Sequence, residues 1–335
     1  MAIRFERDAQ TATFHSPLED FAEVDVEIEI REDPLTGAQA RIVPESFVRP
    51  EDEPDIEPVV SDAEGCFFCP DMVDDVTPTY AGVLDDDRGS RGEATSFPNL
   101  NPYAGHSNVV ALTADHYRPI DGFTTGIFAD GLAAALEYVA AVLADDETNA
   151  SLASVNMNFL RPAGSSIIHP HVQTLVDDRG TNAQRRLLDA SRAYYDREGS
   201  GYWSDLVGEE AGGEREIAST GAVDWLAPFA PTHHRHVLGV VDDPLTDPES
   251  PAIRDLASGL TSVLDAYAAV DLNSFNFALF IAPDEPAMPP VVNLVARSVF
   301  DEYYWSDSPF FVVLHDEGVV DVAPETYAAE TAECF

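Results

Sequence analysis

Residues 158–173 read NFLRPAGSSIIHPHVQ, a stretch that combines a turn signal with two histidines and a glutamine in an otherwise apolar segment. The segment RPAGSS predicts a turn, and IIHPHVQTLVD predicts a strand. Side chains at positions i and i+2 of a strand share one face, about 7 Å apart, so we expect His169, His171 and Gln173 to lie together. Pro170 removes a backbone donor and predicts an edge strand or an irregular one. Three polar side chains between apolar runs indicate the floor of a site, and a solvated strand face is the alternative.

A second motif, GCFFCP at residues 65–70, places Cys66 and Cys69 in a C-x-x-C pair. This spacing is typical of zinc ligands, and histidine is their usual complement in a tetrahedral site. A redox pair is the alternative, but no helix is expected after the motif, which continues as PDMVDD. Two histidines from elsewhere would complete a metal site, and the candidates are His106, His116 and His169.

The HPH stretch can also carry covalent chemistry. A neutral imidazole can attack phosphorus and hold a transferred group, provided that a hydrogen bond orients its second nitrogen. Residues 163–166 (AGSS) supply backbone amides and hydroxyls for phosphate oxygens, and Gln173 supplies an uncharged amide donor. One histidine on a metal and its i+2 neighbour as the nucleophile would let the metal stiffen the catalytic strand.

The order of predicted elements repeats along the 335-residue chain. Residues 24–30 (VDVEIEI) predict a strand, 33–37 (DPLTG) a turn, and 129–144 a helix with apolar side chains at helical spacing. After a glycine- and glutamate-rich stretch near 200–222, strands, a helix and two strands recur, with PPVVNLVARSVF in the place of SSIIHPHVQTLV. The pattern predicts an α+β fold of two units, residues 1–200 and 215–335, each a mainly antiparallel sheet with packed helices. Only the first unit carries the HPHVQ motif.

Acidic side chains dominate the composition. The chain has 61 Asp and Glu against 18 Lys and Arg, a net charge of −43. Such a field repels phosphate backbones, so we expect no nucleic acid partner. The 45% hydrophobic content opposes disorder. Acidic residues interleave with apolar ones throughout, which predicts a folded protein adapted to high salt, from a halophilic source.

The sequence predicts a soluble, cytoplasmic protein. No apolar run of the roughly 20 residues that a membrane span needs is evident. The first residues, MAIRFERDAQ, lack the apolar stretch of a secretory signal. Three cysteines are too few for a disulfide framework, and Cys334 is expected to be inert.

Four stretches together resemble the galactose-1-phosphate uridylyltransferase family of the histidine-triad superfamily. REDPLTGAQARIVPESFVRP (31–50) is similar to the family's amino-terminal signature, and GCFFCP to its cysteine pair. FPNLNPYAGHSNVVALTADH (97–116) is similar to its asparagine-containing stretch, and NFLRPAGSSIIHPHVQ to its active-site pattern. The resemblance implies two histidine-triad-like halves. It also implies ping-pong transfer between a nucleotide sugar and a sugar 1-phosphate through a covalent nucleotidyl-histidine.

The resemblance implies a role for each matching residue. His171 would be the nucleophile, and Gln173 would donate to the transferred phosphoryl group. One structural zinc ion is implied, with the ligands Cys66, Cys69, His116 and His169. The implied nucleotide and phosphate contacts are Arg49, Asn99, Asn158, Gly164, Ser165 and Ser166. A homodimer is implied as well, because family members complete their sites across a subunit interface.

The chain departs from the family pattern at several positions. Ser46 and Asn108 stand where the family has arginines, and no histidine pair precedes Arg297, so we expect no second metal. We expect the run HHRH to be a surface or salt-bridging cluster instead of a metal site; its histidines are His233, His234 and His236.

The carboxy-terminal segment resembles the family only loosely. His315, Asp316 and Val322 fall near positions where the family contacts the hexose, without the expected glutamate and glutamine. The first hypothesis is therefore a hexose-1-phosphate uridylyltransferase. The alternative is a phosphorylase or adenylyltransferase with the same histidine chemistry, acting on an ADP-sugar or a dinucleoside polyphosphate. A third is a non-catalytic, zinc-stabilised binding protein.

Overall fold

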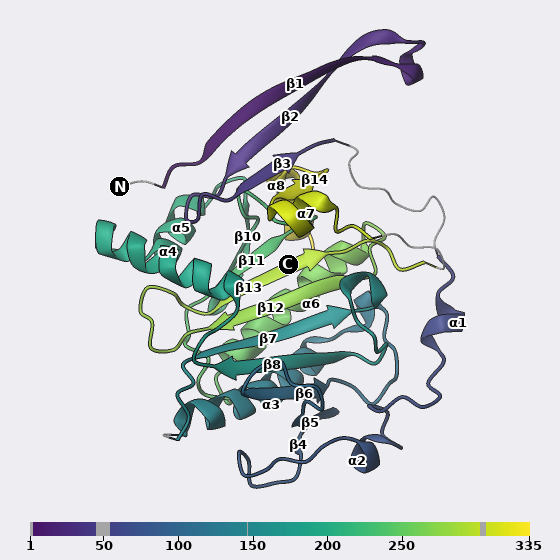
Figure 1. Ribbon diagram of the computed structural model, residues 1–335, viewed down its shortest axis with the longest axis vertical. Coiled ribbons are helices and arrows are strands. Elements are labelled where there is room, and N and C mark those ends of the chain that lie inside the picture. Colours follow the sequence, from purple (N-terminus) through teal and green to yellow (C-terminus); the bar gives the residue numbers. More distant parts are fainter. Residues whose placement is uncertain (1–2, 45–53, 146, 302–305) are drawn as a thin grey trace.

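The centre of the fold is a ten-stranded sheet in which every neighbouring pair of strands is antiparallel. The computed structural model describes residues 3–44, 54–145, 147–301 and 306–335. In spatial order the strands run β4-β5-β6-β8-β7-β12-β13-β11-β10-β9 (Figure 1). Their bounds are β4 Gly89–Arg91, β5 Ala94–Pro98, β6 His106–Ala111, β7 Leu152–Phe159, β8 His171–Asp177, β9 Glu216–Thr220, β10 Val223–Leu226, β11 Val237–Val241, β12 Phe275–Ile281 and β13 Val291–Ala296.

The sheet consists of two halves with the same topology, joined where β7 pairs with β12. Going outward from this seam, the order is β7-β8-β6-β5-β4 on one side and β12-β13-β11-β10-β9 on the other. In each half a long helix, α3 (Thr125–Ala144) or α6 (Ala252–Ala268), follows the third strand along the chain. The arrangement is a pseudo-two-fold repeat, and the predicted α+β class with antiparallel sheet and packed helices is confirmed. The boundaries at 200 and 215 stay a prediction.

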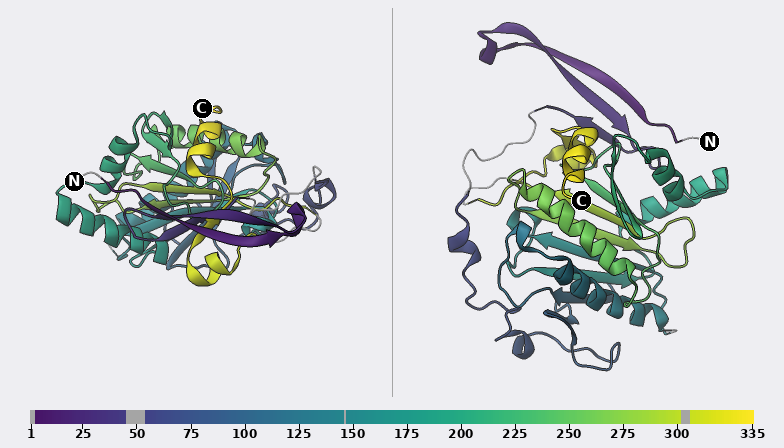
Figure 2. Two further views of the ribbon diagram at one scale, coloured as in Figure 1. Left: turned by 90° about the horizontal axis from the view of Figure 1, so that it is seen from above. Right: turned by 180° about the vertical axis from the view of Figure 1, so that it is seen from behind.

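Helices α3 and α6 lie side by side on one face of the sheet (Figure 2). Each approaches the strands through a glycine. A Cβ on Gly131 of α3 would stand 2.2 Å from the side chain of Leu112, and one on Gly259 of α6 would stand 2.2 Å from Trp225. Both contacts are far shorter than van der Waals distance, so the glycines allow the same close packing in both halves.

Helix α3 corrects the expectation about apolar runs. Its 20 residues are long and apolar enough to cross a membrane by length and composition, although over half of that stretch is buried inside the fold. Thr124 caps its N-terminus by accepting a hydrogen bond from the Ile127 amide, so the helix starts four residues before the predicted 129. Burial against the sheet explains the uniform hydropathy.

The opposite face of the sheet is covered differently in the two halves. Helices α4 (Asn182–Glu198) and α5 (Tyr202–Glu210) pack over the second half, where Trp203 and Leu206 join the core formed by Leu226, Leu238 and Phe280. Over the first half lies the segment with Phe68 and the short helix α2 (Val73–Val76), whereas Val60 of α1 (Glu57–Val60) joins the core on the side of α3. The HPHVQ stretch therefore sits on the face that carries only loops and short helices.

A separate four-stranded sheet has the order β1-β2-β3-β14, with β1 Glu6–Ser16, β2 Ala22–Glu32, β3 Gln39–Ile42 and β14 Gly318–Val320. The predicted strand at 24–30 and turn at 33–37 are confirmed. Strands β1 and β2 form a long ribbon that projects from the body (Figure 1). At its base the buried Arg31 donates to both carboxylate oxygens of Glu325 on α8 (Pro324–Ala332), at 2.8 and 2.9 Å. This pair anchors the ribbon to the carboxy-terminal helix.

Candidate active site and metal centre

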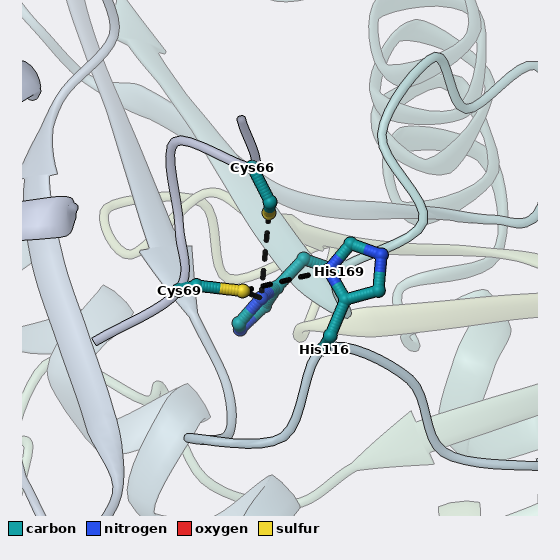
Figure 3. A group of neighbouring side chains, drawn as sticks. All are labelled: Cys66, Cys69, His116 and His169. Atoms are coloured by element: carbon teal, nitrogen blue, oxygen red, sulfur yellow. Dashed lines mark hydrogen bonds between the residues drawn. The ribbon is translucent and has the colours of Figure 1, made fainter. Parts of the chain in front are cut away.

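Two cysteines and two histidines converge beside the first half of the sheet (Figure 3). Cys66 and Cys69 come from the loop before α2, His116 from the segment after β6, and His169 from the residue pair before β8. Their ligand atoms all lie within 4.8 Å of one another. Cys69 Sγ lies 3.5 Å from His116 Nδ1 and 3.7 Å from His169 Nδ1, and Cys66 Sγ lies 3.8 Å from His169 Nδ1.

These distances fit a tetrahedral metal ion. Bonds of about 2.3 Å to sulfur and 2.0–2.1 Å to nitrogen place neighbouring ligands of zinc roughly 3.6 Å apart. His169 Nε2 donates to the Thr113 carbonyl at 2.8 Å, which leaves Nδ1 with a lone pair facing the cluster. Burial and the nearby Cys66 sulfur raise the pKa of Cys69 to about 12, so a thiolate there needs a cation. The four residues form a candidate metal site, as predicted for them.

The strand does not extend over the whole HPH stretch. β8 begins at His171, and the Pro170 carbonyl accepts from the Leu112 amide at 2.9 Å, one step beyond the Ala111–His171 pair, before the chain bends at His169. The expectation that His169, His171 and Gln173 share one strand face is therefore wrong for His169. Its side chain turns to the cysteines because alternation applies only inside the strand, which starts after Pro170.

His171 has a geometry suited to nucleophilic attack. Its Nδ1 donates to the His169 carbonyl at 2.9 Å, which fixes the tautomer and leaves the Nε2 lone pair available. Burial lowers the pKa of His171, so the ring is neutral at physiological pH. The Gln173 amide lies 3.4 Å from Nε2 and the edge of Phe68 contacts the ring, with centroids 5.2 Å apart. A neutral, oriented imidazole next to an uncharged donor can accept an electrophilic phosphorus.

The loop before β8 is built on two residues with positive φ, Leu160 at 65° and Gly164 at 89°. The hydroxyl of the buried Ser165 donates to the Ile167 carbonyl at 2.7 Å, so this side chain shapes the loop. Gly164 and Ser166 are exposed. The Gly164 and Ser165 amides donate to the Arg161 and Leu160 carbonyls at 2.9 and 3.1 Å, so the loop can offer the Ser166 hydroxyl to a phosphate, with Ser165 as its internal brace.

Asn99 and Asn158 approach the same face from either side of β8. Asn99 Nδ2 lies 3.5 Å from the Gln173 side-chain oxygen. Asn158, exposed at the end of β7, accepts at 2.7 Å from the amide of Asn276 on β12. The Arg297 guanidinium in turn donates to the Asn276 oxygen at 2.5 Å.

The sequence did not predict a role for Asn276 or Arg297. Arg297 also donates to both oxygens of Asp307, at 2.6 to 3.1 Å. This network orients the Asn158 amide from the second half of the chain. The only available signal was the position of Arg297 directly after β13, the strand that corresponds to the HPHVQ strand.

The remaining predicted residues have mixed outcomes. Arg49 and Ser46 lie outside the described residues. His106 starts β6 and is not part of the metal cluster. Asn108 is fully buried, accepts from Tyr80 at 2.7 Å and donates to Ser96 at 2.9 Å.

The HHRH run was expected at the surface, and that expectation is wrong for His234 and His236, which are buried at the edge of the second half. A salt-bridging contact is present, because His234 Nδ1 lies 3.0 Å from Asp321 Oδ1. His236 Nε2 instead donates to Asn293 at 3.1 Å. The Ala296 amide donates to the His234 carbonyl at 3.1 Å, so the run lies beside the end of β13 and is buried there.

The comparisons with known proteins agree with this architecture. No family model matches the sequence. An uncharacterized protein of Archaeoglobus fulgidus is 34% identical over 311 residues, covering 92% of both chains.

Two solved structures share the fold at low sequence identity. The ADP-glucose phosphorylase of Arabidopsis thaliana with bound ADP-glucose superposes with a TM-score of 0.69 at 17% identity, over 91% of this chain and 99% of that one. A uridylyltransferase superposes with a TM-score of 0.64 at 20% identity, over 91% and 98%.

Proposed function

From the geometry of its site we propose that the protein is a nucleotidyltransferase acting through a covalent nucleotidyl-histidine. The chain belongs to one family with the Archaeoglobus fulgidus protein. It has the fold of the ADP-glucose phosphorylase and the uridylyltransferase described above. The observation that carries the proposal is the state of His171. Its Nδ1 is held by the His169 carbonyl, its Nε2 is free to attack, and an uncharged amide lies beside it. A non-catalytic binding protein would have no need of this arrangement.

The proposed reaction has two steps. In the first, His171 Nε2 attacks the α-phosphorus of a nucleotide sugar, the Nε2–P bond forms, and the phosphoanhydride P–O bond breaks. Its electron pair leaves with the sugar 1-phosphate. In the second, a phosphate oxygen of the acceptor attacks the same phosphorus, and the electron pair of the N–P bond returns to the imidazole.

The surrounding residues stabilise charge on the transferred group. Gln173 and the Ser166 hydroxyl would donate to its oxygens, Gly164 would let the loop approach it closely, and Asn158 would hold the diphosphate. Neutral donors suit this task because they favour the crowded anionic transition state without a counter-ion that must move. Arg49 and Asn99 are proposed to contact the nucleotide.

Cys66, Cys69, His116 and His169 are proposed to hold one zinc ion with a structural task. The metal would fix the backbone of His169, whose carbonyl orients His171. Metal and nucleophile are thus coupled through one peptide group.

We propose hexose-1-phosphate uridylyltransferase as the specific reaction, with an ADP-sugar phosphorylase as the second candidate. The latter draws on the likeness to the ADP-glucose phosphorylase and on the absence of the family's hexose-binding residues near His315 and Asp316. The two differ in base and in acceptor, which is a sugar 1-phosphate in one case and inorganic phosphate in the other.

Labelling tests both. Radiolabelled UDP-glucose and ADP-glucose, labelled at the α-phosphate, are incubated separately with the protein at high salt. The correct donor should leave an acid-labile, base-stable label that His171→Gly abolishes, and release on adding galactose 1-phosphate or phosphate identifies the acceptor. Absence of label from both donors would contradict the enzymatic proposal.

A homodimer is part of the proposal, and the β1–β2 ribbon supports it. Opposite residues of paired strands share a face, so one side of the ribbon collects apolar side chains and the other acidic ones. The apolar side holds Ala12, Phe14, Val24, Val26, Ile28 and Ile30, and none of them is fully buried. Sedimentation should give a dimer that Val26→Glu weakens, whereas Asp25→Lys on the acidic side should not weaken it.

A further inference from the structure

The face of the large sheet that carries Gln173 continues without a break from the first half into the second. Asn156 on β7 stands opposite Gln173 on β8 and opposite Ala278 on β12. In the neighbouring row, Asn158 stands opposite Asn276. Cross-strand partners share one face of a sheet, and neighbouring strands are about 4.8 Å apart. These side chains therefore form one floor, which begins beside the proposed transfer site and crosses the seam between the halves.

A cavity of about 780 Å³ lies over this floor. Asn156, Asn158, Asn276 and Ala278 line it, and residues of α4 and α5 line its facing wall. Its volume falls within the roughly 300–1,000 Å³ of small-molecule sites. Two strand spacings, about 10 Å, separate β8 from β12. A diphosphate with its attached sugar can bridge this distance, so one substrate can reach from His171 into the cavity.

Asn156 and Asn158 each offer the cavity one polar atom without a hydrogen-bond partner among the described residues. The Asn156 amide nitrogen donates to Ser154 Oγ at 2.9 Å and to the Gln173 carbonyl at 3.3 Å. The side-chain oxygen of Asn156 is therefore left as an acceptor. The Asn158 oxygen accepts from Asn276, so the Asn158 amide nitrogen is left as a donor. The floor thus presents an oriented acceptor and an oriented donor.

The cavity is also lined by His233, whose imidazole is half-buried. Its Nδ1 lies 3.3 Å from Thr232 Oγ1, and its Nε2 has no hydrogen-bond partner among the described residues. Burial and the nearby Arg297 guanidinium lower the pKa of His233 to about 4, so the ring is uncharged at neutral pH. A sugar hydroxyl can both donate and accept, so it suits a mixed set of neutral donors and acceptors.

The charges of the lining favour an uncharged group. Arg186 is the one arginine among the described lining residues, and it is paired with Asp316. The sequence contains no lysine. Carboxylates are more numerous, and two of them have arginine partners that do not line the cavity; the carboxylates are Asp33, Glu210, Asp316 and Glu317. A further anionic group would meet this negative charge without a free cation, whereas a hydroxyl can donate to a carboxylate.

We propose that the cavity binds the uncharged sugar of the nucleotide sugar, and that the second half of the same chain completes this subsite. The inference rests on the transfer proposed above, because it places the sugar relative to His171. With the nucleoside on the Asn99 side of His171, the sugar lies on the β7 side. Asn156 and His233 hold its hydroxyls, and the small side chain of Ala278 leaves room for its ring.

Labelling with two donors that differ in the sugar tests the proposal. The full-length protein is incubated with UDP-glucose or ADP-glucose, whichever labels His171, and separately with the corresponding UDP or ADP, each labelled at the α-phosphate. Attack on the nucleoside diphosphate forms the same nucleotidyl-histidine and releases phosphate instead of sugar 1-phosphate. Ala278→Leu fills the cavity and His233→Leu removes Nε2. Each should slow labelling by the nucleotide sugar at least tenfold relative to labelling by the nucleoside diphosphate.

The matched control is Ala193→Leu, the same substitution at an exposed position of α4 that does not line the cavity. It should leave the ratio of the two labelling rates at the wild-type value. Circular dichroism would confirm that each variant is folded. The uronate analogue of the donor, whose sugar carries a carboxylate, should label wild type at least tenfold more slowly than the hexose donor.

A mixture of two variants tests whether one chain completes its own subsite. His171→Gly keeps the cavity and lacks the nucleophile, whereas Ala278→Leu keeps the nucleophile and has a filled cavity. The two chains are co-expressed with different affinity tags, and label on the Ala278→Leu chain is measured. Its labelling should stay as slow as in Ala278→Leu alone. Recovery of the wild-type rate would show that the cavity serves a partner's nucleophile, and would overturn completion within one chain.

Two results would overturn the inference while wild-type labelling upholds the proposed function. One is an unchanged ratio of the two rates in Ala278→Leu and His233→Leu, which would include equal slowing with both donors and would then place the nucleoside in the cavity. The other is equal labelling by the hexose and uronate donors. Absence of label on wild type from every donor would contradict the proposed function and this inference with it.

Discussion

The side chain of Asn276 on β12 donates to the side-chain oxygen of Asn158 on β7 at 2.7 Å, across the seam between the two halves. Asn276 also donates to the Ala163 carbonyl at 2.9 Å, so its amide holds both the end of β7 and the phosphate-side loop. Arg297 fixes the other end of the same amide. The half without a nucleophile thus positions a residue of the proposed transfer site.

Replacing Asn276 by Ala is expected to slow labelling of His171 by about 10- to 100-fold, because Asn158 loses the contact that orients its amide. Rapid-quench measurement of label incorporation checks this. Asn273→Ala is the matched control. Asn273 bonds to the backbone of Phe300 and, among the described residues, makes no hydrogen bond to Asn158 or the loop, so its removal should affect stability and not the labelling rate. Equal rates in wild type and Asn276→Ala would remove the positioning role.

Metal removal is expected to lower the melting temperature, because closure of the Cys66–Cys69 loop depends on the ion. His169→Ala should reduce bound zinc, measured by plasma emission, and should also lower the melting temperature. His171→Gly should keep both near wild type while abolishing labelling. If the two variants lost zinc equally, the division of tasks between the two histidines would be wrong.

The pH dependence of stability is expected to include the Arg31–Glu325 pair. Burial alone would raise the pKa of Glu325, but hydrogen bonds from Arg31 and Arg215 outweigh it and lower the pKa to about 2. A carboxylate with a depressed pKa stabilises the fold above its unfolded pKa of about 4.3, and this contribution is lost as pH falls from there towards 2.

Glu325→Gln should therefore cost on the order of 3 kcal/mol at pH 7, since it leaves Arg31 buried without its charge partner. It should also flatten the acid limb of the urea-unfolding profile. Glu330→Gln on the same helix also removes the partner of a buried guanidinium, Arg235, but the Glu330 carboxylate is half-exposed and makes one contact, so this change should cost less than Glu325→Gln. Equal effects of both substitutions would show that the Arg31 pair is not specially stabilising.

Salt is expected to stabilise the fold. The net charge of −43 makes self-repulsion large at low ionic strength, and raising salt from about 0.1 M to about 1 M shortens the screening length from roughly 10 Å to 3 Å. The melting temperature should rise with NaCl and equally with KCl, since the effect depends on ionic strength. A melting temperature independent of salt would mean that repulsion among the surplus carboxylates does not limit the stability of the fold.

Local patterns in the sequence predicted the local parts of this structure. Alternation in VDVEIEI located β2, and the repeated order of strands and helix predicted the two units, because each depends on neighbours in sequence. The cysteine spacing pointed to a metal cluster for the same reason. Pro170 marks the limit of this reasoning. Strand periodicity was extended through it, whereas the strand starts only at His171.

Contacts between distant segments could not be predicted. Asn158 and Asn276 are 118 residues apart and meet because β7 and β12 pair in one register, which no local pattern specifies. The burial of His236 has the same origin, since it requires β11 to lie beside β13, where His236 contacts Asn293. Hydropathy alone also cannot distinguish α3 from a membrane span, because a helix packed against a sheet and against a second helix has few solvent-exposed positions.

The pairing of β7 with β12 limits how the two halves of this fold can change during evolution. Phe159 faces Phe275 at one end of this pairing and Ala153 faces Ile281 at the other, so each half supplies the edge that the other half covers. A fragment that stopped in the glycine-rich segment would leave β7 with an open apolar border, which invites aggregation. The second half, which has no counterpart of His171, is therefore needed for the first half to fold. A descendant protein could lose the residues of the proposed transfer site, but it could not lose the strands of the second half.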